Sequence, residues 1–252
     1  MSTKKLLILL SLFCASCAVK NNLATTPSDK IKIEGSIAVS HLCDSEWIHR
    51  YDKRDIATLI ERAKSEEKQC DVLFFGSSSI RLWKSLKEDM APLRVVNRGY
   101  GGATLRDLHY NYPTVMADYK PKCFVIYCDN DLRTKPSINI SVGELFDLYR
   151  MLFDRLEADY PNTPVYFLAI KHCKRRETIR DRQSVFNALM KEYAERSKQV
   201  TFVDTCTELL TAEGEIDPSL FTKDNIHLNE QGYVRWTKLL KPMLLKRFQT
   251  AE

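Results

Sequence analysis

The feature that most constrains the fold is a regular alternation of short apolar runs with longer amphipathic segments. The runs are rich in β-branched and aromatic residues and lack polar alternation, which is typical of strands covered on both faces. They occupy residues 71–75, 93–97, 122–128, 164–170 and 200–204. Strands of this kind, alternating with helices, predict a parallel sheet.

Amphipathic segments predict the helices between and around these strands. They cover residues 54–67, 141–160, 178–199 and 229–248. Ser141 and Thr178 stand first in two of these segments, and both are residues that cap helices. Crossover connections between parallel strands are right-handed, so the helices should cover both faces of the sheet. The predicted fold is α/β, a three-layer α/β/α sandwich around a mostly parallel five-stranded sheet.

Composition limits the class of protein. A chain of 252 residues with 44% hydrophobic residues is long enough for one α/β domain with a full core. The formal net charge of +5 is mild, and the sequence has no basic stripe or arginine-rich tail. We therefore expect no nucleic-acid partner.

The N-terminal segment predicts targeting out of the cytoplasm. Lys4 and Lys5 precede the apolar run LLILLSLFCA, which is too short to span a bilayer comfortably. Small residues then lead to Cys17, an arrangement that resembles a bacterial lipobox, where the cysteine takes lipid. A plain secretory signal cleaved nearby is the alternative. Both interpretations predict an extracytoplasmic protein, and the first predicts membrane association only through a lipid anchor at Cys17.

This targeting hypothesis divides the chain into three parts. Residues 1–17 form the signal peptide, polar residues 18–33 form a flexible tether, and residues 34–252 form the globular domain. The oligomeric state has no sequence signature.

Six cysteines follow Cys17, an even number that permits disulfides but forms no recognisable framework. Several lie in apolar strands, where cysteine behaves as a small core residue. No metal-binding spacing of cysteine and histidine is present, so we expect no zinc site. Asp129 and Asp131 suggest a calcium loop, but its twelfth position is Ile140 instead of Glu. We expect no metal and no cofactor.

Polar and glycine-rich motifs follow several of the predicted strands. They are GSSSI at residues 76–80, NRGYGGAT at 97–104, CDND at 128–131 and, before the last helix, DNIHLN at 224–229. In open parallel sheets, ligands bind outside the carboxyl ends of the strands. The motifs should therefore meet at one edge of the sheet, where they supply the groups that acyl transfer needs.

Together these motifs resemble the conserved blocks of the GDSL-like or SGNH hydrolases, and the resemblance extends over about residues 56–244. It implies a flavodoxin-like fold and five site residues. Ser78 aligns with the nucleophile, Gly102 and Asn130 with oxyanion-hole residues, and Asp224 and His227 with the remaining catalytic pair.

Two residues depart from the family pattern. Ser77 stands where many members have aspartate, and Cys128 stands where glycine is usual in the third block. Glycine there lets the backbone turn tightly beside the substrate. The position of Asn130 is therefore the part of the resemblance that the structure must test.

The residue types also suit the chemistry. A serine hydroxyl needs a base to remove its proton, and the imidazole of His227 suits that role near neutral pH. Asp224 can fix the tautomer of the ring, as in other triads. The backbone N–H groups of Ser78 and Gly102 and the amide of Asn130 can stabilise the oxyanion.

Each motif alone has a simpler interpretation, such as a turn serine, an Asx turn or a surface histidine. The four other histidines are expected to be of that surface kind. The sequence favours a serine esterase on short-acyl esters, such as acetyl groups of glycans, because no long apolar insertion separates the motifs. A lysophospholipase or thioesterase and a catalytically impaired binding module are the alternatives.

Overall fold

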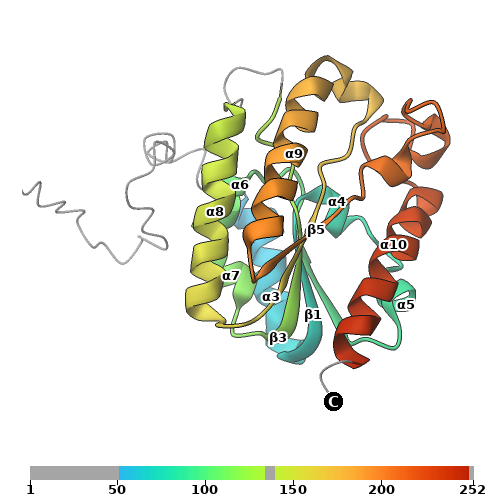
Figure 1. Cartoon of the computed structure of the whole chain (residues 1–252). Coiled ribbons are helices and arrows are strands. Elements are labelled where there is room, and N and C mark those ends of the chain that lie inside the picture. Colours follow the sequence, from blue (N-terminus) through green and yellow to red (C-terminus); the bar gives the residue numbers. More distant parts are fainter. Residues whose placement is uncertain (1–50, 134–139, 250–252) are drawn as a thin grey trace, which may run out of the picture.

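The computed structural model of the chain describes residues 51–133 and 140–249. The predicted signal peptide, the tether, Cys17 and Cys43 lie outside the described residues. In the described part, five strands form one sheet in the order β2-β1-β3-β4-β5, and every neighbouring pair is parallel (Figure 1). The strands are β1 (Gln69–Gly76), β2 (Val95–Gly99), β3 (Lys120–Tyr127), β4 (Val165–Leu168) and β5 (Val200–Val203).

Helices cover both faces of this sheet, which confirms the predicted three-layer fold (Figure 1). One face carries α3 (Ala57–Ser65), α6 (Leu105–Tyr110), α7 (Tyr112–Met116), α8 (Val142–Asp159) and α9 (Arg180–Arg196). The other face carries α4 (Ser78–Arg81), α5 (Leu86–Met90) and α10 (Glu230–Gln249). Short helical turns are η1 (Asp52–Ile56), η3 (Lys174–Ile179), η4 (Thr207–Leu209) and η5 (Pro218–Leu220).

The side chains of the central strands explain why the apolar runs lack polar alternation. In β1, Leu73 and Phe75 belong to the core on one face, and Val72 and Phe74 belong to the core on the other. All four are almost completely buried. A strand buried on both faces needs apolar residues at consecutive positions.

The strand order places a ligand site at the ends of β1 and β3. The chain passes from β1 outward to β2 and then returns to the other side of β1 for β3. The register pairs Gly76 with both Gly99 and Tyr127, so these three strands end level with one another. A reversal of strand order of this kind opens a crevice at the carboxyl ends.

The predictions for the helix caps were right at one position and wrong at the other. Ser141 caps α8 in a capping box with Glu144. Thr178 does not cap α9, because it lies inside the 3-10 turn η3 and α9 begins two residues later without a side-chain cap.

Within the described ranges, no helix is long and apolar enough to cross a membrane. The described cysteines are buried free thiols: Cys70, Cys123, Cys128, Cys173 and Cys206.

Candidate active site

The turn after β1 brings Ser78 to the edge of the sheet. Gly76 has φ of +133°, and a Cβ atom there would lie 1.9 Å from the carbonyl oxygen of Tyr127, so only glycine fits. The next amide, of Ser77, donates to that same carbonyl at 2.9 Å. Ser78 then begins α4. Its amide donates to no other described residue and stays available to a ligand.

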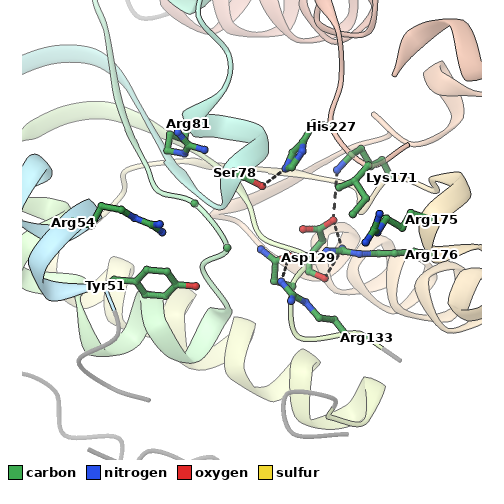
Figure 2. Close-up of a pocket in the computed structure, with 14 residues that line it drawn as sticks. Tyr51, Arg54, Ser78, Arg81, Asp129, Arg133, Lys171, Arg175, Arg176 and His227 are labelled. Carbon is green, nitrogen blue, oxygen red and sulfur yellow. Dashed lines mark hydrogen bonds and ion pairs between the residues drawn. The ribbon is translucent and has the colours of Figure 1, made fainter. Parts of the chain in front are cut away.

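Three of the predicted residues meet in a hydrogen-bonded chain. Ser78 Oγ lies 2.9 Å from His227 Nε2, and His227 Nδ1 lies 2.5 Å from Asp224 Oδ2. An ionised carboxylate can only accept, so the ring proton belongs on Nδ1. Nε2 is then free to accept the proton of the Ser78 hydroxyl. Figure 2 shows Ser78 and His227 joined at the pocket.

A tight loop fixes the Asp224 carboxylate. Its Oδ1 accepts from the backbone N–H groups of Ile226 and His227 and from the hydroxyl of Thr222. Burial alone would raise the pKa of Asp224, but these hydrogen bonds and the His227 ring outweigh it and hold the pKa well below its ordinary value. Asp224 is therefore ionised at neutral pH and can orient the imidazole.

Gly102 and Asn130 line the same pocket as Ser78 and His227. Gly102 has φ of +72°, and a Cβ atom there would lie 2.8 Å from the hydroxyl of Tyr51. Its amide donates to no other described residue. A side chain at this position would be strained and would crowd the pocket.

The amide of Asn130 is oriented by two arginines. Its Oδ1 accepts hydrogen bonds from Arg133 and from Arg176, each at 2.7 Å. The oxygen of the amide therefore faces the two arginines, and Nδ2 faces away from them. One hydrogen of Nδ2 goes to the carbonyl oxygen of Ala103 at 2.8 Å, and the second remains for a ligand.

Cys128 does not disturb this arrangement. Its φ is not positive, so the chain at this point does not need glycine. The thiol is fully buried, and its Sγ lies 3.2 Å from the carbonyl oxygen of Ala103. The hydroxyl of Tyr149 accepts from the Cys128 N–H and donates to its carbonyl oxygen. Cys128 is thus a core residue just before the loop that carries Asn130.

The other two serines of GSSS contact different groups from Ser78. Ser77 Oγ donates to Asp129 Oδ1 at 3.5 Å, and Ser79 Oγ accepts from Lys171 Nζ at 3.0 Å. Both side chains are buried, so Ser78 alone of the three is partly exposed and contacts His227.

A buried ionic cluster beneath the site was not predicted from the sequence. Asp129 contacts Arg176 at 2.6 Å and Lys171 at 3.5 Å (Figure 2). It also accepts a hydrogen bond from the hydroxyl of Tyr127 at 2.9 Å. Burial alone would raise the pKa of Asp129, but Arg176 and Lys171 hold it well below its ordinary value. A signal was available, because Lys171 and Arg176 follow β4 and thus lie at the carboxyl end of a parallel strand.

These groups surround a pocket of about 610 Å³ (Figure 2). Four of the five predicted site residues line it, and Asp224 lies behind His227.

The expectation that His109 and His172 are surface residues was wrong. Both are buried, with ring nitrogens close to the Leu148 carbonyl oxygen and to the Ser184 hydroxyl, respectively. Among the described residues, no group of three or more His, Cys, Asp or Glu is placed to hold a metal.

Comparison with known proteins gives a family and several solved structures of similar fold. The model of the GDSL-like Lipase/Acylhydrolase family matches residues 74–235. A protein from Streptococcus pneumonia provisionally named a platelet activating factor has 20% identity and a TM-score of 0.65, covering 83% of this chain and all of its own. No curated protein matches the chain.

Two further structures come from named hydrolases. A GDSL-like lipase from Bacteroides thetaiotaomicron has 18% identity and a TM-score of 0.60, over 79% of this chain and 98% of its own. A catalytic mutant of an acetylxylan esterase from Geobacillus stearothermophilus has 17% identity and a TM-score of 0.57, over 69% and 94%. At these identities, the likeness shows the fold.

Proposed function

The chain belongs to the GDSL-like lipase and acylhydrolase family, and from that premise we propose that it is a serine esterase acting on short-acyl esters of glycans. One observation carries the proposal: Ser78 Oγ lies 2.9 Å from His227 Nε2, and that ring lies 2.5 Å from the Asp224 carboxylate. This is the arrangement that converts a serine hydroxyl into a nucleophile.

In the first half of the proposed reaction, His227 Nε2 takes the proton of Ser78 as Oγ bonds to the ester carbonyl carbon. The resulting oxyanion accepts hydrogen bonds from the amides of Ser78 and Gly102 and from Asn130 Nδ2. His227 then gives its proton to the alcohol oxygen as the carbon–oxygen bond breaks. The alcohol leaves, and the acyl group remains on Ser78.

In the second half, a water molecule takes the place of the alcohol. His227 accepts a proton from the water as its oxygen attacks the acyl carbon, and the same donors hold the oxyanion. The acid leaves when the bond to Ser78 Oγ breaks and His227 returns the proton to that oxygen. These steps use only residues of this chain and water.

The pocket lining favours a short acyl group over a long one. Among the described lining residues, Ile226 alone has an aliphatic side chain, and most of the others are polar or charged. A palmitoyl chain would gain little from burial there. This supports an esterase over the lysophospholipase or thioesterase alternative. A structural neighbour that is an acetylxylan esterase is consistent with acetyl esters.

A fluorophosphonate probe tests the nucleophile. The wild-type protein and the Ser77→Ala and Ser79→Ala variants should be labelled, and Ser78→Ala should not. Labelling of Ser78→Ala that is lost in Ser79→Ala would refute the assignment. A p-nitrophenyl ester series from acetate to palmitate then tests chain length, with acetate expected to give the highest kcat/KM. Absence of both labelling and turnover would favour the binding-module alternative.

A further inference from the structure

The pocket around Ser78 is strongly cationic. Six of its fourteen lining residues carry a positive charge: Arg54, Arg81, Arg133, Lys171, Arg175 and Arg176. Asp129 is the one carboxylate among the described lining residues. A concave site lined by one sign of charge focuses its potential and concentrates ligands of the opposite sign.

Half of these cations have partners in the protein. Arg176 and Lys171 share the buried carboxylate of Asp129, and Arg54 pairs with Asp55 at 2.7 Å. Each of these three cations contacts a carboxylate, which Arg176 and Lys171 share, so they do not by themselves indicate a ligand.

Arg81 and Arg175 are different. Their guanidinium groups form neither a hydrogen bond nor an ion pair with any residue in the described ranges. Arg81 ends the helix that Ser78 begins, and a Cβ atom at Gly101 would lie 3.2 Å from its Nε. The amide of Arg175 donates to the carbonyl oxygen of Asn225, in the loop of His227. In Figure 2 the two arginines lie on opposite sides of the Ser78–His227 pair.

Arg133 adds a third cation that forms no ion pair with any described residue. One of its terminal nitrogens donates to Asn130, but its Nε is buried and has no hydrogen-bond partner among the described residues. Burial and the neighbouring Arg176 both lower the pKa of the Arg133 guanidinium. An anion in the pocket would relieve this repulsion and give the buried N–H group an acceptor.

We propose that the substrate is an ester of an anionic alcohol, whose carboxylate, sulfate or phosphate group is held by the arginines around Ser78. This inference rests on the proposed function, because an acetyl group carries no charge and the anion must then belong to the alcohol. Guanidinium groups match the planar or tetrahedral oxygens of such anions through paired hydrogen bonds. Arg81 and Arg175 are the specificity-determining residues in this proposal.

The test compares acetate release from three probes that differ in charge. They are methyl 2,3,4-tri-O-acetylglucuronoside with a free carboxylate, its neutral methyl ester, and methyl 2,3,4-tri-O-acetylglucoside 6-phosphate. At low ionic strength, kcat/KM for one or both anionic probes should exceed that for the neutral probe by about tenfold or more. The preference should shrink as salt is added.

Variants link this preference to the two arginines. Arg81→Gln and Arg175→Gln should each reduce the ratio of anionic to neutral kcat/KM severalfold, and Arg81→Lys and Arg175→Lys should reduce it less, because lysine keeps the charge but loses the paired hydrogen bonds. Arg196→Gln is the matched control, because Arg196 is an exposed arginine of α9 that pairs with Glu192 away from the pocket. It should leave the ratio unchanged.

The possible outcomes separate this inference from the proposed function. Equal kcat/KM for all three probes, with fluorophosphonate labelling of Ser78 intact, would overturn the anionic substrate and leave the esterase. A preference that persists in Arg81→Gln and Arg175→Gln would overturn their role. Loss of acetate release from every probe, together with absent labelling, would overturn the esterase itself. A preference for the phosphate over the carboxylate would support the inference and identify the anion.

Discussion

Asp129→Asn should be among the most destabilising isosteric changes in this protein. The Asp129 side chain is only 3% exposed, and it is the counter-ion of two buried cations, Arg176 at 2.6 Å and Lys171 at 3.5 Å. An amide keeps the shape but removes the charge, which leaves both cations uncompensated in a medium that solvates them poorly. Removing one partner of a buried ion pair costs about 3–5 kcal/mol.

That cost is large against the total stability of a domain, which is about 5–15 kcal/mol. For a domain of this size, each 1 kcal/mol lowers Tm by about 2–4 °C, so Asp129→Asn should lower Tm by about 6–20 °C. Urea unfolding followed by circular dichroism gives the free energy directly, because the slope with denaturant should stay constant while the midpoint falls.

Asp147→Asn is the control for this measurement. Asp147 pairs with Arg150 at 3.5 Å, but the two side chains are 65% and 52% exposed, so losing the pair should cost about 0–0.5 kcal/mol. A cost for Asp129→Asn within about 1 kcal/mol of the control would refute the claim that this carboxylate compensates the buried cations.

The same carboxylate predicts sensitivity to acid. The pKa of Asp129 is lower in the folded protein than in the unfolded chain. Its contribution to stability is therefore fully present above the unfolded pKa of about 3.9 and is lost as the pH falls below that value. Asp129→Asn should remove this part of the pH dependence, and unfolding measured from pH 6 to pH 3 would show it.

Three further predictions concern the loop after β3 and one concerns the N-terminus. Burial raises the pKa of Asp131 to about 6, so stability should fall as the pH rises from about 4 to 6; urea titrations of Asp131→Asn should lack that slope, and an unchanged slope would contradict the assignment. Cys128→Gly should cost about 1–2 kcal/mol in thermal melts through lost burial and added chain entropy, and a neutral result would mean that the thiol contributes little to the core. Asn130→Ala should lower kcat by about two to three orders of magnitude with little change in KM; an unimpaired kcat would exclude this amide from the oxyanion hole. We also propose that Cys17 carries lipid, so Cys17→Ala expressed in a bacterium should move from the membrane fraction to the soluble fraction, and equal release of both proteins into the soluble fraction would indicate an ordinary cleaved signal.

The layers of the fold were predictable because they depend on a pattern that is repeated along the chain. Apolar residues at consecutive positions, as in Val72 to Phe75, are needed only when a strand is buried on both faces. The prediction that Thr178 caps a helix was wrong because it depended on a single residue. A 3-10 turn can precede a helix and bond its first backbone N–H groups without a side-chain cap, so a threonine at this position does not by itself mark the start of α9.

The charges of the pocket were not predictable, because no local pattern distinguishes them from ordinary surface charges. Arg81 directly follows the serine motif, whereas Lys171 and Arg175 come after the end of β4, far away in the sequence. The three side chains line one pocket only because the strands are ordered β2-β1-β3-β4-β5. Ligands bind at the carboxyl ends of parallel strands, so the loop after β4 could have been predicted to lie at the site. That rule does not tell which cations of the loop form ion pairs.

The three consecutive serines illustrate how one motif is divided among different tasks. Ser78 contacts His227, and Ser77 and Ser79 contact Asp129 and Lys171, the two opposite charges of the cluster beneath the site. An aspartate in place of Ser77, as in many family members, would put a second carboxylate against Asp129, where like charges repel at short range. A hydroxyl at position 77 and a carboxylate at position 129 are therefore mutually consistent. In this chain the negative charge beneath Ser78 comes from Asp129 of the third block, and Ser77 donates a hydrogen bond to it.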